Sequence, residues 1–132
     1  MATLNRLPGG VGASVSAVTS LLDGRPSTVL DIGCGFGDFA RRLRRVHHAS
    51  IVAADASPEV LAIARDRLVG IEGVEVRHAD VRALPLEDGA LDVAHASLLL
   101  HHLDAADAVT ALREMRRVAR GGVVVNDLRR GP

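Results

Sequence analysis

Short apolar runs alternate along the chain with segments in which apolar residues recur at helical spacing. The runs cover 29–32, 51–54 and 74–79, and each has the length of a buried strand. Amphipathic or capped helical segments cover 13–22, 38–43, 58–70 and 104–119. Strands that alternate with helices form βαβ units, whose right-handed crossovers give a mainly parallel sheet. The pattern therefore predicts an α/β fold with a doubly wound, Rossmann-like sheet.

Local signals predict where several of these helices begin and end. Ser57 suits an N-cap and Pro58 the first helical position, while a capping box starts at Asp104. The pair 121–122 is Gly-Gly, which is expected to end the last helix. Residues 82–89 are expected to form a loop.

The most informative segment is 29–37, an apolar strand that enters a loop with glycine at every second position, Gly33, Gly35 and Gly37. Because glycine has no Cβ, such a loop turns sharply and lets a ligand lie against bare backbone. Asp31 precedes and Asp38 follows the glycines, and two carboxylates there would repel a pyrophosphate. The loop therefore predicts a ligand that carries positive charge. A dinucleotide fingerprint would also need a glycine where Asp38 stands, which disfavours a nicotinamide-dependent oxidoreductase.

Acidic residues stand near the ends of three successive predicted strands. Asp31, Asp55 and Asp80 are separated by 24 and 25 residues, one for each βα unit. Their common register predicts that all three lie at the carboxyl edge of the sheet, where open α/β sheets bind ligands. An acid at the Asp55 position suits the hydroxyls of a ribose. The alternative is that these acids are solvated loop residues or helix caps.

Segment 31–37 resembles the first motif of the class I S-adenosylmethionine-dependent methyltransferases. Asp55 resembles the ribose-binding acid of that family, and Asp80-Val81 resembles its adenine-contacting pair. Segment 91–103 resembles its fourth-strand motif, and 121–127 its fifth strand. The resemblance extends from about residue 28 to the C-terminus. It implies a three-layer α/β/α sandwich with strand order 3-2-1-4-5.

S-adenosylmethionine is the cofactor that this resemblance implies. Asp31 would hold the methionine ammonium, Asp55 the ribose, and Asp80 the adenine amino group. The carbonyl of Ala96 would lie near the methionine amine. The implied cofactor-binding residues are Asp31, Gly33, Cys34, Gly35, Gly37, Asp55, Ala56, Asp80, Val81 and Ala96.

The resemblance also implies residues that act on the methyl acceptor, a small molecule methylated at oxygen. His101 and His102 follow the fourth strand, and Asp127 follows the fifth. Histidine can accept the acceptor's proton near neutral pH. The alternative is that the pair only packs beneath the next helix. His95 and the pair 47–48 are interpreted as structural or surface residues, and no metal site is expected.

The chain departs from the family pattern after the fifth strand, where a helix and a two-stranded hairpin usually follow. We expect residues 1–27 to form a helical lead-in and 28–132 a truncated methyltransferase core. The fifth strand would then be an open edge through which a homodimer could form. Three interpretations stay open: a fragment of a longer enzyme, a self-pairing protomer, or a non-catalytic S-adenosylmethionine-binding module.

The composition adds limits to this picture. The 132 residues carry 16 basic and 16 acidic side chains, every base is arginine, and the formal net charge is zero. This balance favours neither nucleic acid nor a membrane as a partner, and the arginine clusters suit solvated helix faces. Cys34 is the one cysteine, and we find neither a secretory signal nor a membrane-spanning run. A cytoplasmic location is expected.

Overall fold

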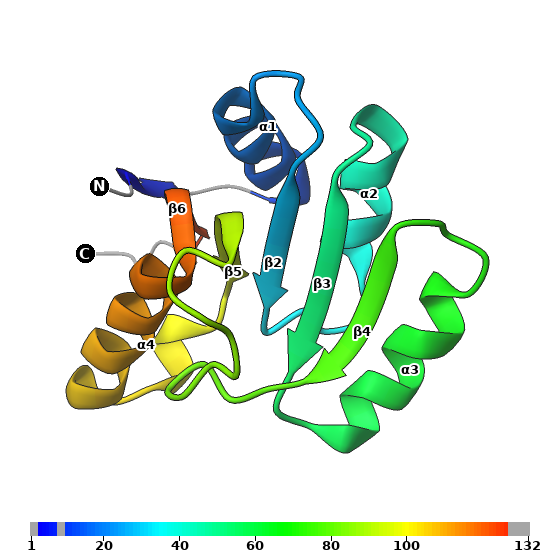
Figure 1. Ribbon diagram of the computed structural model, residues 1–132. Coiled ribbons are helices and arrows are strands. Elements are labelled where there is room, and N and C mark those ends of the chain that lie inside the picture. The colour runs from blue at the N-terminus through cyan, green and yellow to red at the C-terminus, as the bar shows by residue number, and fades with distance from the viewer. Residues whose placement is uncertain (1–2, 8–9, 127–132) are drawn as a thin grey trace.

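The protein is described by a computed structural model that covers residues 3–7 and 10–126, with side chains from residue 10 onward. Its elements follow the predicted alternation of strands and helices (Figure 1). They are β1 (Thr3–Leu7), α1 (Val11–Leu22), β2 (Thr28–Ile32), α2 (Asp38–Val46), β3 (Ser50–Asp55), α3 (Pro58–Leu68), β4 (Val74–His78), β5 (Leu91–Ser97), the 3₁₀ turn η1 (Leu100–His102), α4 (Ala105–Val118) and β6 (Ala119–Asn126).

One six-stranded sheet runs through the molecule in the order β1-β6-β5-β2-β3-β4, and all its strand pairs are parallel. Counted along the chain from β2, the last five strands have the predicted order 3-2-1-4-5. Parallel strands need crossover connections, and here helices provide most of them. The predicted Rossmann-like architecture is therefore confirmed.

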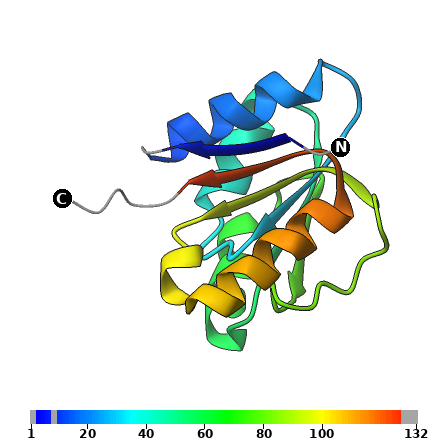
Figure 2. The ribbon, with the colours of Figure 1, turned by 90° about the vertical axis from the view of Figure 1, so that its left-hand side faces the viewer.

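Helices cover both faces of the sheet (Figures 1 and 2). Apolar side chains of α1, α2 and α3 form one core cluster with alternate strand residues, including Val29, Val93 and Val124. Their sequence neighbours point to the other face, where Leu30 and Ala94 pack in a second cluster with α4. Because side chains alternate along a strand, each central strand contributes to both cores, as a sheet covered on both faces requires.

The predicted helix starts are confirmed by their caps. The Ser57 hydroxyl accepts a hydrogen bond from the Val60 backbone N–H at 3.2 Å, with Pro58 in the first turn. The Asp104 carboxylate accepts one from the Asp107 N–H at 2.8 Å. Residues 82–89 form turns without a helix, as expected.

The N-terminal segment differs from the prediction, because it is not wholly helical. Thr3–Leu7 forms β1, which pairs with β6 from Thr3 opposite Gly122 to Leu7 opposite Asn126. The edge of β6 that we expected to be open for a homodimer is therefore occupied within the same chain. Pairing satisfies backbone groups that an edge strand would leave exposed. The contact joins residues more than a hundred positions apart, so no local pattern announces it.

The Gly-Gly pair at 121–122 does not end α4, which stops at Val118 and leads directly into β6. Gly121 lies instead in a strand beside an irregular register between Leu91 and Val93. A Cβ at Gly121 would lie 2.7 Å from the Asp92 carbonyl oxygen. The glycine therefore permits a close approach of two backbones rather than a turn.

Gly121→Ala is expected to lower the free energy of unfolding by about 1–3 kcal/mol, because a rigid backbone atom blocks the new methyl group. Gly12→Ala is the matched control, since a Cβ there meets only an Arg42 side-chain atom at 3.6 Å within a helix. That control is expected to be neutral or stabilising by about 0.5–1 kcal/mol. Urea denaturation measures both, and equal stabilities of the two variants would contradict the assigned backbone contact.

Candidate functional site

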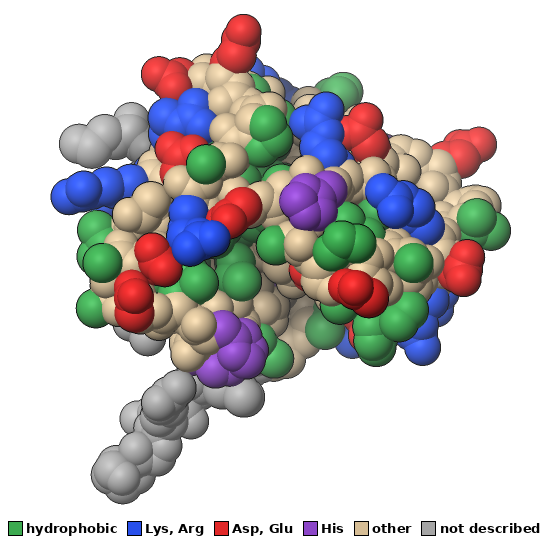
Figure 3. Space-filling view, turned by 90° about the horizontal axis from the view of Figure 1, so that it is seen from below, with side chains coloured by type: hydrophobic (Ala, Val, Ile, Leu, Met, Phe, Trp, Pro, Cys, Tyr) green, Lys and Arg blue, Asp and Glu red, His purple; other side chains and the backbone are tan. Residues whose placement is uncertain are grey.

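The carboxyl ends of the strands meet at one edge of the sheet, the lower edge in Figure 1. Seen from this side, the surface is hollowed, and histidine side chains reach it in two separate places (Figure 3). The loops after β2, β3, β4 and β5 all emerge here. This is the position at which open α/β sheets bind their ligands.

The glycine loop after β2 has the backbone conformation that its composition predicts. Gly33, Gly35 and Gly37 have φ values of +75°, +55° and +91°, which residues with a Cβ rarely adopt. The loop is fastened to β3, because the N–H groups of Gly33 and Cys34 both donate to the Ala54 carbonyl, at 2.8 and 2.9 Å. The turn is therefore rigid and glycine-dependent.

The three glycines face different surroundings. A Cβ at Gly37 would lie 2.8 Å from the Leu68 side chain, and one at Gly33 would lie 3.3 Å from Leu99. At Gly35 a Cβ would meet no atom of residues 10–126 within 4 Å. Gly33 and Gly37 thus meet close neighbours, whereas Gly35 presents bare backbone to open space.

Asp55, at the end of β3, connects three loops of this edge. Its carboxylate accepts hydrogen bonds from the Gly35 N–H at 3.2 Å and from the Ser57 N–H at 3.0 Å. Its backbone carbonyl accepts one from the Ala79 N–H at 3.1 Å. The side chain is half-buried, so the predicted ribose acid is held by backbone donors yet remains accessible. The neighbouring Ala56 is exposed.

Asp80 lies in the loop after β4 and is bound by Arg82, with 2.6 Å between Nη2 and Oδ2. Hydrogen bonds from the Arg82 side chain and backbone lower the pKa of Asp80 to about 2. The guanidinium also reaches Asp107 at 3.5 Å. Asp80 is therefore ionised at neutral pH and half-buried, so it can accept a hydrogen bond from a ligand amino group.

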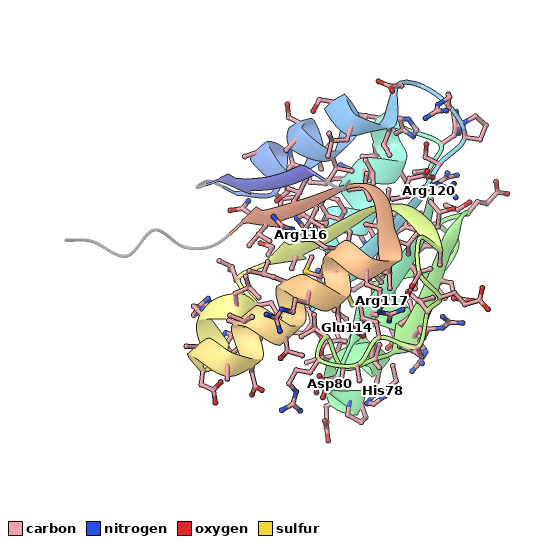
Figure 4. The ribbon with its side chains drawn as sticks, turned by 60° about the vertical axis from the view of Figure 1, so that its left-hand side comes forward. His78, Asp80, Glu114, Arg116, Arg117 and Arg120 are labelled. Carbon is pink, nitrogen blue, oxygen red and sulfur yellow. The ribbon has the colours of Figure 1, made fainter. Side chains whose placement is uncertain are left out.

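Two residues of α4, Glu114 and Arg117, form hydrogen bonds with the loop that follows Asp80 (Figure 4). The sequence did not predict this contact. Glu114 accepts a hydrogen bond from the Leu84 N–H at 2.8 Å. Arg117 donates to the carbonyls of Leu84 and Leu86 at 3.0 and 2.7 Å. Arg117 also donates to Glu114 and thereby lowers the pKa of that carboxyl. The spacing of three residues on one helix is a recognisable signal for the pair, but not for its loop partner.

Asp31 is the predicted site residue whose surroundings differ most from those we expected. It is 2% exposed, and its Oδ1 lies 2.8 Å from Nδ1 of His95. His95 is fully buried in β5, which bears out its structural interpretation, and its ring stacks on Phe39 with centroids 3.8 Å apart. That interpretation did not include its hydrogen bond to Asp31. A histidine between two alanines in a buried strand was the available signal, because a buried polar group needs a partner.

Three other predicted contact residues are buried. Cys34, Val81 and Ala96 are 8%, 5% and 0% exposed. Burial, with the nearby carboxylates of Asp31 and Asp55, raises the pKa of the Cys34 thiol to about 12. The thiol is therefore protonated at neutral pH and serves packing rather than nucleophilic chemistry.

The predicted histidine pair lies in η1, immediately beyond β5. The rings of His101 and His102 are 4.0 Å apart between centroids and tilted by 38°. Nδ1 of His101 is enclosed without a hydrogen-bond partner among the described residues, whereas His102 is exposed. Leu98, which precedes them, has a φ of +59°, a strained conformation of the kind that gathers at functional sites. Asp127, the third predicted acceptor-side residue, lies outside the described residues.

The residues at this edge fit a nucleoside that carries an ammonium group. Bare backbone at Gly35 provides space, Asp55 and Asp80 provide carboxylate acceptors, and the side chain of Asp31 lies buried behind the loop. Within 3–7 and 10–126, no group of three or more metal-ligating side chains is found. The fold and the site together define a Rossmann-like nucleoside-binding domain.

Comparison with known proteins identifies the family. The family model described as "Methyltransferase domain" matches residues 29–122. The chain is 42% identical over 113 residues to the demethylmenaquinone methyltransferase of Thermus thermophilus, covering 83% of this chain and 50% of that protein. It is 35% identical over 97 residues to the malonyl-[acyl-carrier protein] O-methyltransferase of Pectobacterium atrosepticum, covering 74% and 36%.

A solved structure, of an S-adenosylmethionine-dependent methyltransferase from Aquifex aeolicus, matches with a TM-score of 0.66 and 25% identity, covering 80% of this chain and 57% of that one. The chain belongs to the class I S-adenosylmethionine-dependent methyltransferase family. Family and site together imply S-adenosylmethionine as the cofactor. The chain spans half the length or less of these two curated relatives.

Two further observations concern the surface. No helix in the described part of the chain is long and apolar enough to cross a membrane. The arginines of α2 are partly engaged within the chain: Arg41 donates to the Arg67 carbonyl and Arg44 to the Ala49 carbonyl, at 2.8 and 2.9 Å. With Arg45 and Arg67 they line a groove of about 550 Å³ between α2 and the end of α3.

Proposed function

We propose that this protein transfers a methyl group from S-adenosylmethionine to an oxygen atom of a small molecule. The observation that carries the proposal is the glycine loop, with Gly35 open to solvent and its N–H held 3.2 Å from the Asp55 carboxylate. The two curated relatives support the acceptor class, since one name states demethylmenaquinone and the other O-methylation of a carrier-bound malonyl group. The enclosed thiol of the one cysteine suits the reducing cytoplasm.

When bound, the cofactor supplies a methyl group activated by a sulfonium sulfur. Asp55 would accept hydrogen bonds from the ribose hydroxyls, and Asp80 would accept one from the adenine amino group. Asp31 would face the ammonium, with the Ala96 carbonyl nearby. Gly33, Cys34, Gly35 and Gly37 would supply a close backbone surface. Val81 would pack on the cofactor or donate from its backbone, with Ala56 also in contact. These contacts would hold the methyl carbon in line with the acceptor, and such positioning can supply a large part of the rate enhancement.

The histidine pair is proposed to serve the acceptor. A hydroxyl acceptor loses its proton near the transition state, and a neutral imidazole within hydrogen-bond reach can take it. His101 is the stronger candidate because its enclosed Nδ1 lacks a partner among the described residues. His102 and Asp127 are proposed to help position the acceptor.

The test follows methyl transfer from S-adenosylmethionine to a panel of small phenols, quinols and amines. His101→Asn is expected to slow transfer to oxygen by about 100-fold or more, because a general base contributes about 10²–10⁴. Affinity for S-adenosylhomocysteine is expected to stay unchanged, and His48→Asn, an exposed histidine beyond α2, is the control.

Two outcomes would contradict the proposal in different ways. Transfer to amines alone, unaffected by His101→Asn, would refute oxygen methylation by this base. Cofactor binding without transfer to any acceptor would favour the non-catalytic binding module that the sequence left open.

A further inference from the structure

Four polar side chains that lie far apart in the sequence meet inside the protein. Ser14 of α1, Asp31 of β2, His95 of β5 and Asn126 of β6 are each at most 2% exposed. They are the buried polar or charged residues of the described chain. Three contacts of 2.8 Å join them in a row: Asn126 Nδ2 to Ser14 Oγ, Ser14 Oγ to His95 Nε2, and His95 Nδ1 to Asp31 Oδ1.

A further contact orients the side-chain amide of Asn126, which stands at one end of this row of hydrogen bonds. Asn126 Nδ2 also lies 3.0 Å from the Gly10 carbonyl oxygen, which can only accept, so the amide NH₂ must face it. The same NH₂ donates to Ser14 Oγ, and the serine hydroxyl can then donate to His95 Nε2. In that arrangement His95 carries its proton on Nδ1 and donates a hydrogen bond to Asp31. One neutral tautomer satisfies every contact in the row.

The order Ser–His–Asp is also that of a hydrolytic nucleophile, but this serine is not accessible. Ser14 is 1% exposed, and its oxygen accepts the Asn126 hydrogen bond. An acyl substrate has no route to it, whereas Asp31 belongs to the cofactor motif. We therefore interpret these hydrogen bonds as orienting Asp31, not as activating Ser14 as a nucleophile.

We propose that His95 is a positioning residue for cofactor binding, which holds Asp31 in the orientation that receives the methionine ammonium. This inference rests on the proposed function, because it assumes that the site binds S-adenosylmethionine. A buried carboxylate needs hydrogen bonds to stay ionised and fixed. His95 supplies one to Oδ1, and no hydrogen bond to Oδ2 is found among the described residues. Oδ2 is the atom that the ammonium meets.

The row also ties the cofactor acid to distant elements. Ser14 lies in the first half of α1, and Asn126 is the last residue of β6. The backbone carbonyl of Asn126 also accepts a hydrogen bond, at 2.8 Å, from the N–H of Leu98, the residue with a φ of +59°. The orientation of Asp31 therefore depends on α1 and on the end of β6.

Two substitutions of His95 each remove one of its two hydrogen bonds and retain the other. His95→Asn places an amide near the former Nδ1 and retains a donor for Asp31, whereas His95→Gln reaches toward Ser14 and loses that donor. Both remove the ring that stacks on Phe39, so they share the packing defect. Calorimetric titration would use two probes, S-adenosylhomocysteine and 5′-methylthioadenosine, which has the same nucleoside but no ammonium.

His95→Gln is expected to weaken S-adenosylhomocysteine binding by about tenfold or more, the scale of one hydrogen bond to a charged group. Its affinity for 5′-methylthioadenosine should be unchanged, and His95→Asn should stay within about threefold of the unsubstituted protein for both probes. Equal losses in both variants and for both probes would overturn the inference, because a merely structural role predicts them. If the unsubstituted protein binds neither probe, the proposed function itself fails.

A measurement on the unsubstituted protein keeps the inference testable if both variants unfold. Nitrogen chemical shifts of the His95 ring report which nitrogen carries the proton. The inference predicts a neutral ring protonated on Nδ1. A ring protonated on Nε2 alone would overturn it, because His95 could not then donate to Asp31.

Discussion

Replacing Asp55 with alanine is expected to weaken binding of S-adenosylhomocysteine by about 100-fold or more. In the proposed site the carboxylate would accept hydrogen bonds from two ribose hydroxyls, and each bond to a charged group contributes about 1.5–3 kcal/mol. The substitution also removes the acceptor of the Gly35 and Ser57 N–H groups, so the loop itself loses support. Isothermal titration measures the affinity, and urea denaturation measures the accompanying loss of stability.

Asp92→Ala is the matched control for Asp55→Ala. Asp92 also holds a backbone N–H, that of Thr28 at 2.8 Å, and an arginine, Arg120 at 2.8 Å, but at the opposite edge of the sheet. It is expected to cost stability while the ligand affinity is retained. If Asp55→Ala bound as tightly as the unsubstituted protein, the ribose role of Asp55 would be wrong. If Asp92→Ala lost binding equally, the effect would be one of general destabilisation.

Gly35→Ala is expected to reduce the affinity for S-adenosylhomocysteine by 10- to 100-fold, about 1–3 kcal/mol, because its methyl group enters the space that the ligand needs. No atom of the described residues lies within 4 Å of that methyl group, and the φ of +55° adds a backbone cost of about 1–2 kcal/mol. Titration of the folded variant checks the prediction. Unchanged affinity would mean that the ligand does not lie against this loop.

Gly70→Ala isolates the backbone cost in this experiment. Gly70 has a φ of +80° and equally open surroundings, but it follows α3 and belongs to no predicted contact. It should lose similar stability and keep its affinity. Gly37→Ala should behave differently from both, since its Cβ would collide with Leu68 at 2.8 Å and destabilise the fold.

Most helices and strands could be predicted because the sequence signals that specify them are local. The apolar runs, the caps at Ser57 and Asp104 and the glycine loop each act within a few residues. The sheet order came instead from the family resemblance, and five strands of the observed sheet follow it. Strand β1 was missed because its only partner is β6, at the other end of the chain.

The sequence predicted where the site residues lie, but not the hydrogen bonds that connect them. The predicted positions of Asp55 and Asp80 at the carboxyl edge are confirmed, yet the backbone donors on Asp55 and the Arg82 bond to Asp80 depend on loop geometry. The burial of Asp31 against His95 needs two strands in register, with Asp31 opposite His95. Gly121 was misinterpreted because a helix-ending glycine and a strand glycine look alike without the neighbouring strand.

The most direct test of the account is calorimetric titration of this protein with S-adenosylhomocysteine, with NADH as the comparison. We expect saturable binding of S-adenosylhomocysteine and none of NADH, because carboxylates at Asp31 and Asp38 oppose a pyrophosphate. Binding of NADH, or no binding of S-adenosylhomocysteine by demonstrably folded protein, would contradict it.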